Sequence, residues 1–71
     1  MIHFTKYSDS KFDILNKHKV FYTREQIEEV ASLPDKIEKH GKCFFATRDG
    51  IRVLYKKDGE IIKILSFYPV K

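Results

Sequence analysis

The chain has 71 residues, a hydrophobic content of 42%, one cysteine and a formal net charge of +4. These values exclude a disordered polypeptide, an internal disulfide and a membrane-spanning helix, which needs roughly 20 consecutive apolar residues. Because the charged N-terminus also lacks the apolar segment of a signal peptide, we expect a single soluble domain over residues 1–71, located in the cytoplasm and without contact to a membrane.

The first third of the chain predicts a short strand followed by a helix. Residues 2–5 have the apolar character of a strand, and Thr5 is a good helix N-cap. A helix is expected over residues 6–18, where Phe12 and Leu15 are three positions apart and therefore share one face. The remaining positions of this helix are mostly polar, which predicts a surface helix with one buried stripe.

A second helix begins after Thr23. Thr23 and Gln26 have the spacing of a capping box, in which each side chain bonds the backbone amide of the other residue. Ile27 and Val30 form the apolar stripe of this helix. Pro34 ends it, because proline lacks an amide hydrogen and disfavours helical geometry at the preceding residue.

The second half of the chain predicts strands. A peripheral extended segment is followed by three strands, and the pairs Asp49-Gly50 and Asp58-Gly59 between them each fit a two-residue type I′ hairpin turn. The predicted segments are 35–40, 42–48, 51–57 and 60–67. The element order β-α-α-β-β-β-β predicts an α+β fold in which two helices pack on one face of a small antiparallel sheet.

Two type I′ turns would fix the register of the meander. They set Arg48 opposite Ile51 and Lys57 opposite Glu60, so each side chain can be assigned to one face of the sheet. The predicted core face carries Phe44, Ala46, Val53, Tyr55, Ile62 and Ile64. We expect this apolar face to pack against the two helices.

The opposite face of the meander mixes cations with apolar side chains. It is predicted to carry Cys43, Phe45, Thr47, Arg52, Leu54, Lys56, Ile61, Lys63, Leu65 and Phe67. A solvated sheet face is normally polar, so this mixture indicates a binding surface, with cations for phosphates and apolar side chains for bases or a partner protein. The alternative is a small hydrophobic cluster covered by the C-terminal tail or by a second copy of the chain. In this register Tyr68 falls on the core side.

The positive charge is concentrated in the same part of the chain. Residues 1–40 carry seven Lys/Arg and seven Asp/Glu, whereas residues 41–71 carry seven Lys/Arg and three Asp/Glu. The whole excess of +4 therefore belongs to the meander. It favours an acidic partner such as RNA or an acidic protein, with ordinary solubilising surface charge as the alternative.

Several segments resemble a family of small uncharacterised bacterial and archaeal domains related to the BrnT and RelE/ParE toxins of toxin–antitoxin pairs. The resemblance is carried by the helix sequence of residues 23–30, by Leu33-Pro34-Asp35, by residues 52–55 followed by Asp58-Gly59, and by Phe67-Tyr68-Pro69. It implies a compact RelE-like α+β fold, an acidic antitoxin-like partner, and cleavage of messenger RNA by basic and aromatic side chains on the sheet and near the C-terminus.

The resemblance also assigns individual positions. Arg52 matches the basic residue before the Val-x-Tyr strand, and Tyr68 matches the aromatic residue of the Tyr-Pro ending. His18 is one of the residues matching the basic position late in the first helix. The family often has a His and an Arg early in that helix, and here the chain departs from the pattern with Tyr7 and Lys11.

A metal-independent endoribonuclease needs a base for the 2′-hydroxyl, an acid for the leaving group and cations for the developing charge. The candidate catalytic residues are Arg52, Lys56 and Tyr68. The candidate residues for binding RNA or a partner are Phe45, Arg52, Lys56, Lys63, Phe67, Lys11 and His18. The competing hypothesis is a non-enzymatic interaction module that uses the same face for a protein, including a second copy of itself, and the sequence leaves open whether the chain is an enzyme.

No cofactor or metal is predicted. His40 and Cys43 lie three positions apart, but no second ligand pair follows at a spacing typical of zinc sites.

Overall fold

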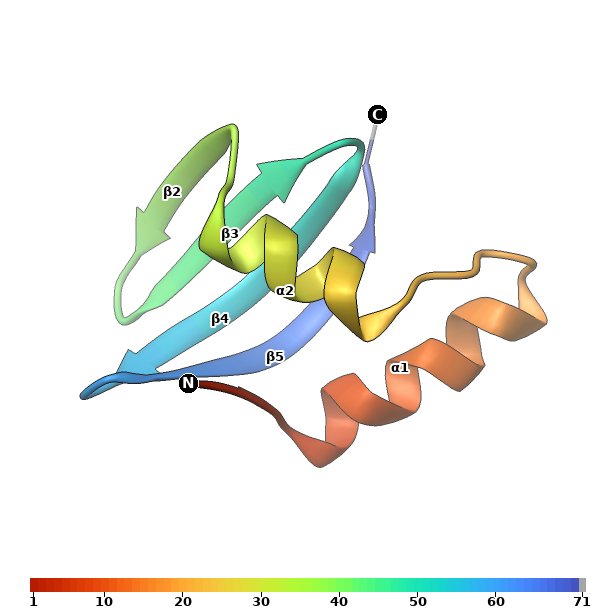
Figure 1. Ribbon diagram of the computed structural model, residues 1–71, viewed down its shortest axis with the longest axis horizontal. Helices are drawn as coiled ribbons and strands as arrows, with labels where there is room; N and C mark the ends of the chain where they lie inside the picture. The colour runs from red at the N-terminus through yellow and green to blue at the C-terminus, as the bar shows by residue number, and fades with distance from the viewer. Residues whose placement is uncertain (71) are drawn as a thin grey trace.

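The computed structural model describes residues 1–70, which form two helices and a five-stranded sheet (Figure 1). The elements are β1 (Ile2–Phe4), α1 (Lys6–Lys17), α2 (Arg24–Ser32), β2 (Lys36–His40), β3 (Cys43–Arg48), β4 (Ile51–Asp58) and β5 (Ile61–Pro69). The strand order in the sheet is β1-β5-β4-β3-β2. The predicted α+β class and element order are confirmed.

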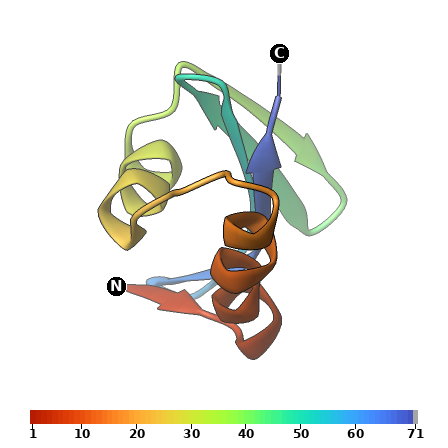
Figure 2. The same ribbon diagram turned by 90° about the vertical axis from the view of Figure 1, so that its right-hand side faces the viewer.

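The sheet is mixed, whereas the sequence predicted a wholly antiparallel one. β2, β3, β4 and β5 form antiparallel pairs, but β1 runs parallel to β5 at the edge of the sheet. Figure 2 shows α2 to one side of the twisted sheet and α1 alongside β1 and β5. Within residues 1–70, neither helix is long and apolar enough to cross a membrane.

The two helices begin at the predicted caps. The Oγ1 atom of Thr5 accepts the amide hydrogen of Ser8 at 3.2 Å. Thr23 and Gln26 form the predicted capping box, in which the Thr23 side chain accepts from the Gln26 amide at 3.2 Å and the Gln26 side chain accepts from the Thr23 amide at 2.8 Å. α2 ends two residues before Pro34. Local sequence signals therefore determine both helix starts.

The β3–β4 hairpin has the predicted turn and register. Asp49 and Gly50 have φ values of 52° and 74°, as a type I′ turn requires at both central positions. Arg48 lies opposite Ile51, and the pairing continues without irregularity along β3. The prediction for this hairpin is confirmed at every paired position.

The β4–β5 hairpin uses a different turn from the one predicted. Its central residues are Gly59, with a φ of 62°, and Glu60, whose φ is not positive, so the turn is type II′. Asp58 consequently pairs with Ile61, and the predicted pairing of Lys57 with Glu60 is wrong. The register moves by two positions, which leaves every side chain near the turn on its predicted face.

A β-bulge in β5 then reverses the faces near the C-terminus. Tyr55 lies opposite Ile64 but the next residue of β4, Leu54, lies opposite Ser66, so Leu65 is the extra residue. Beyond Leu65, each β5 side chain points to the face opposite to the one that a regular strand would give it.

Phe67 and Tyr68 are two of the residues whose faces the bulge exchanges. Phe67 lies opposite Val53 and has an exposed fraction of 0%, so its predicted position on the uncovered face is wrong. Tyr68 lies opposite Arg52 and not on the core side. The bulge thus moves a phenylalanine into the core and a tyrosine beside an arginine.

The core lies between the helices and the inward face of the sheet. The ring of Phe67 contacts those of Phe12 and Tyr22, with centroids 4.6 and 6.3 Å apart, which joins α1 and the following loop to β5. The buried apolar residues are Leu15, Ile27, Val30, Ala31, Ala46, Ile51, Val53, Tyr55, Ile64 and Phe67. Each large side chain of this set contributes about 1.5–3 kcal/mol by leaving water.

Candidate functional site

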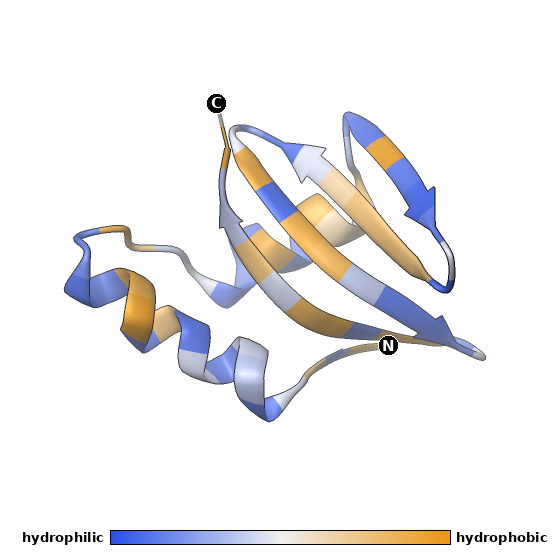
Figure 3. Ribbon diagram, turned by 180° about the vertical axis from the view of Figure 1, so that it is seen from behind, coloured by the Kyte–Doolittle hydropathy of each residue, from blue (hydrophilic) through white to orange (hydrophobic). Residues whose placement is uncertain are grey.

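Within residues 1–70, no helix covers one face of the sheet. Figure 3 views the molecule from behind and shows β3, β4 and β5 with neither α1 nor α2 in front of them. We call this surface the outer face, and the strand register gives its members. They are His3, Lys36, Glu38, His40, Cys43, Phe45, Thr47, Arg52, Leu54, Lys56, Asp58, Ile61, Lys63, Ser66 and Tyr68.

A basic row crosses the outer face from one edge of the sheet to the other. His3 lies beside Lys63, Lys63 beside Lys56, Lys56 beside Cys43, and Cys43 beside His40, so the row has one residue from each of the five strands. Lys56 and Lys63 are direct cross-strand neighbours, an arrangement that like-charge repulsion disfavours unless an anion lies nearby.

An apolar row lies next to the basic row. It consists of Phe45 and Leu54, which pair across β3 and β4, with Ser66 and Glu38 at its two ends. Both apolar side chains are only half-buried. The His40 ring lies edge-on to the Phe45 ring, with 5.0 Å between centroids. This row therefore exposes an aromatic and an aliphatic side chain to solvent.

A third row completes the surface on the other side of the apolar row. It contains Tyr68, Arg52, Thr47 and Lys36, again as cross-strand neighbours. The Arg52 Nε atom donates to the Thr47 Oγ1 atom at 3.4 Å, which holds the guanidinium against the sheet. Lys56 lies four positions after Arg52 along β4, so the two cations are about 13 Å apart along the strand and lie on either side of the apolar row.

Two cations of the outer face are available for an external anion. Lys63 pairs with Asp58 at 3.2 Å and Lys36 pairs with Glu38 at 3.3 Å. In the part of the chain that the structure describes, Arg52 and Lys56 form no ion pair. Hydrogen bonds from His40 and Lys36 lower the pKa of Glu38, so this carboxylate is already bound by two side chains of its own strand, β2.

The outer face brings together five of the predicted site residues. Phe45, Arg52, Lys56, Lys63 and Tyr68 all lie on it. Tyr68 joins the group only because of the bulge, which no signal in the sequence marks. The bulge also explains why Phe67, another predicted site residue, lies in the core.

Lys11 and His18 do not belong to the outer face. They lie in α1 and at its C-cap, and α1 packs on the inward face of the sheet through Phe12. The Lys11 ammonium group lies 5.9 Å from the centre of the exposed Tyr7 ring. These helix positions therefore do not belong to the outer face, and their role in binding stays a prediction.

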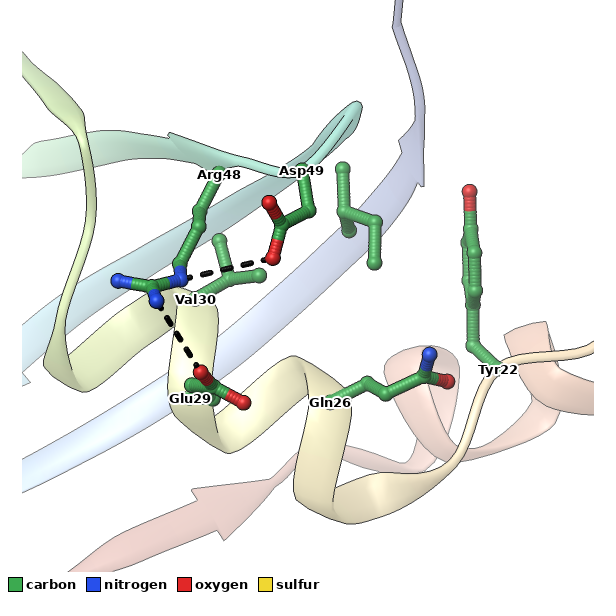
Figure 4. A pocket seen from close by; sticks show the side chains of 7 residues that line it. Tyr22, Gln26, Glu29, Val30, Arg48 and Asp49 are labelled. Carbon is green, nitrogen blue, oxygen red and sulfur yellow. Dashed lines mark ion pairs between the residues drawn. The ribbon is translucent and has the colours of Figure 1, made fainter.

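A hollow with a volume of about 210 Å³ lies on the helix side, between α2 and the β3–β4 turn (Figure 4). Its lining residues are Tyr22, Gln26, Glu29, Val30, Arg48, Asp49 and Ile51. Burial raises the pKa of Tyr22. The hollow contains two carboxylates and one guanidinium, so it offers no excess of positive charge to an anion.

Arg48 connects β3 to the end of α2, a role that the sequence analysis missed. Its Nη1 atom donates to the Leu33 carbonyl oxygen at 2.7 Å, and its Nη2 atom lies 3.3 Å from the Glu29 carboxylate. Asp49 lies 3.6 Å from its Nε atom. One sequence signal for this role was available: Arg48 is a charged residue that the alternation of β3 places on the core face, directly before a turn. Its contacts are those of a structural clamp at a helix C-terminus.

Comparisons with known proteins do not extend these observations, because no protein-family model, no curated protein and no solved structure matches the chain. Within residues 1–70, no three His, Cys, Asp or Glu side chains gather closely enough to hold a metal ion. The resemblance to the BrnT and RelE/ParE toxins stays a prediction.

Proposed function

We propose that the outer face binds single-stranded RNA. The observation that carries this proposal is the apolar row of Phe45 and Leu54, exposed between Lys56 on one side and Arg52 on the other. Unpaired bases stack on exposed aromatic rings, and arginine and lysine neutralise the phosphates that follow the same strand. Double-stranded nucleic acid is a poorer match, because its bases are not free to reach Phe45 or Tyr68.

The charge distribution supports RNA over a purely apolar protein partner. Arg52 and Lys56 have no carboxylate partner in residues 1–70, so binding an anion breaks no ion pair of theirs. A partner protein with an apolar surface would have to desolvate both cations without compensation, which is costly. An acidic antitoxin-like protein would avoid that cost, and the experiment below separates it from RNA.

We further propose that Arg52 and Tyr68 take part in RNA cleavage, since they are direct neighbours across β4 and β5. Cleavage by this route is an attack of the 2′-oxygen on the adjacent phosphorus. The 2′-hydroxyl gives its proton to a base, and the departing 5′-oxygen receives one from an acid. The Tyr68 hydroxyl is the candidate acid, and Arg52 beside it would stabilise the negative charge on the phosphoryl oxygens. Lys56, about 13 Å away along β4, would bind a neighbouring phosphate of the same strand.

The binding proposal is tested by fluorescence anisotropy with a labelled single-stranded RNA oligomer at several salt concentrations. Each phosphate contact on a single strand contributes about −0.7 to the slope of log K against log salt. The double variant Arg52→Ala with Lys56→Ala should lose most of the affinity and reduce that slope by about 1.4. The matched control is Lys6→Ala with Lys17→Ala, which removes the same charge from exposed positions of α1.

Absence of RNA binding, or a salt-independent affinity, would refute the proposal, and so would equal effects of the two double variants. In the binding-competent chain, Tyr68→Phe tests cleavage alone, because it keeps the aromatic ring and removes the hydroxyl. We expect unchanged RNA affinity with loss of product formation on a sequencing gel. Cleavage that persists in this variant would exclude Tyr68 as the acid.

A further inference from the structure

β1 and β2 are the two edge strands of the sheet. The backbone of β2 pairs with β3 on one side and with no strand of residues 1–70 on the other. Such an edge presents free amide and carbonyl groups that a further strand can bind. β2 also exposes an apolar side chain, because Ile37 has an exposed fraction of 51% on the helix side of the sheet, where α2 packs mainly over β3 and β4. Both features indicate that β2 can bind a further strand.

The sequence around Ile37 is complementary to its own reverse. Residues 35–39 read Asp-Lys-Ile-Glu-Lys. In an antiparallel pair of two copies centred on Ile37, Asp35 lies opposite Lys39 of the second copy and Lys36 lies opposite Glu38 of the second copy. Two-fold symmetry repeats each of these contacts, so four pairs of opposite charge surround an Ile–Ile contact. Opposite charges directly across two strands stabilise the pairing, and like charges destabilise it.

Most of this segment is already in strand geometry, and Asp35 lies directly before β2. The Asp35 amide donates to the Thr47 carbonyl oxygen at 2.9 Å, and residues 36–40 pair with β3. Lys36 and Glu38 point to the outer face, because they lie opposite Thr47 and Phe45. Ile37 points to the helix side. The contacts between Lys36 and Glu38 and the contact between the two Ile37 side chains therefore each join side chains on the same side of the sheet.

Other registers are unfavourable. Centring the pair on Glu38 sets Glu38 opposite itself, and centring it on Lys36 sets Lys36 opposite itself. In a register whose centre falls between two consecutive residues of β2, a side chain that points inward in one copy would lie opposite a side chain that points outward in the other. This arrangement is incompatible with a two-fold axis normal to the sheet. Only the register centred on Ile37 combines symmetry, charge complementarity and burial of the exposed isoleucine.

We propose that two copies of this chain associate through β2, antiparallel and centred on Ile37, to form one continuous ten-stranded sheet. The two-fold axis is normal to the sheet, so both outer faces lie on the same side and form one longer surface. A five-residue edge is small compared with the 1,200–2,000 Å² of a typical stable interface, so the dimer forms with a dissociation constant between about 10 µM and about 1 mM. This association does not depend on RNA binding.

The test is sedimentation equilibrium of the full chain over that concentration range, with two charge reversals. Lys36→Glu gives β2 of each copy two acidic residues on the outer face, and Glu38→Lys gives it two basic residues there. Each variant alone should have a dissociation constant at least ten-fold higher than the unmodified chain. An equimolar mixture of the two should associate again, because every acidic position then faces a basic one.

The mixture isolates the contact between copies. Each reversal also disrupts the pair between Lys36 and Glu38 within one strand, which is 3.3 Å long, but mixing cannot restore that pair. Lys42→Glu and Glu60→Lys, at exposed turn positions, match the two changes in charge and should leave the dimer intact. A chain that is monomeric at 1 mM, a dimer that survives both reversals, or a mixture that stays monomeric would overturn the proposal.

The register has a separate test. Ile37→Cys in a Cys43→Ser background places two thiols directly opposite each other at the two-fold axis, close to the separation that a disulfide needs. Mild oxidation should give a covalent dimer. Leu33→Cys in the same background is the control, since Leu33 is apolar and 62% exposed but lies outside β2. Equal cross-linking of the two variants would contradict the register.

Discussion

The two hairpins of the sheet contain the same dipeptide but differ in turn type and register. At Asp49-Gly50 both residues are central in the turn and both have positive φ, whereas at Asp58-Gly59 only the glycine does, and Asp58 is the last residue of β4. The β3–β4 hairpin follows its local sequence. The β4–β5 hairpin is also constrained by β1, which pairs with β5 from the other side, and by α1. The β3–β4 hairpin has further partners as well, since β3 pairs with β2 and β4 with β5. An Asp-Gly pair therefore permits more than one type of turn and does not by itself determine the register.

The bulge in β5 shows how packing against distant parts of the chain changes the regular pairing of a strand. Without it Phe67 would point to the outer face and Tyr68 to the core. With it, Phe67 is fully buried against Phe12 and Tyr22. Burying a phenylalanine contributes about 1.5–3 kcal/mol, whereas the disturbed ladder at Leu65 loses about one hydrogen bond, typically about 1 kcal/mol. Tertiary packing therefore outweighs regular pairing in this strand.

The largest effect is expected from Phe67→Ala. The substitution leaves a cavity in the core between α1, the loop after it and β5, and it should lower the free energy of unfolding by about 3–5 kcal/mol. For a chain of this size such a loss is a large part of the total stability. The matched control is Phe45→Ala on the outer face, which should cost less than about 1 kcal/mol. Urea unfolding followed by circular dichroism gives both values, and equal losses would contradict the reversal of faces at Leu65.

The sequence predicted those features that depend on neighbouring residues. Both helix caps, the type I′ turn and the side of the sheet that carries Arg52, Lys56 and Lys63 follow from local patterns. The error in the second turn did not move these cations to the other face, because a register shift of two positions preserves the alternation of side chains. The basic part of the candidate site was therefore predictable.

The remaining features depend on contacts between distant parts of the chain. No glycine or proline marks the bulge at Leu65, and its effect becomes clear only when Phe67 is seen against Phe12 of α1. The parallel pairing of β1 with β5 has no local sequence signal either. For these reasons the neighbourhood of Arg52 and Tyr68 could not be predicted from the sequence, although it contains two of the three candidate catalytic residues.

A smaller effect separates the two turns directly. Asp49 has a φ of 52°, a conformation that aspartate tolerates better than alanine does, so Asp49→Ala should destabilise the chain by about 1 kcal/mol. Asp58 has no positive φ and is exposed, so Asp58→Ala should change stability by less than about 0.5 kcal/mol. Thermal unfolding monitored by differential scanning calorimetry compares the two. A larger loss for Asp58→Ala would mean that the second hairpin also uses a type I′ turn.

The smallest effect concerns Tyr55, the β4 residue that both hairpins share. Tyr55 lies opposite Phe44 on one side and Ile64 on the other, its ring is stacked on that of Phe44 with centroids 5.3 Å apart, and desolvation raises its pKa above the ordinary value of 10.0. The unfolded chain then loses this proton at a lower pH than the folded chain does. Stability is therefore complete below pH 10 and falls as the pH rises toward the pKa of the folded state.

Replacing Tyr55 by phenylalanine removes that proton while keeping the ring. In urea titrations between about pH 8 and pH 11, the unmodified chain should lose stability steeply above pH 10, and Tyr55→Phe should lose less. Burial also raises the pKa of Tyr22, so Tyr22→Phe should reduce the alkaline slope as well, whereas Tyr7→Phe, at an exposed position of α1, should leave it unchanged. If stability fell as steeply with pH in Tyr55→Phe as in the unmodified chain, the Tyr55 hydroxyl would have to reach water. The pairing of Tyr55 with Ile64 would then be more open than the structure shows.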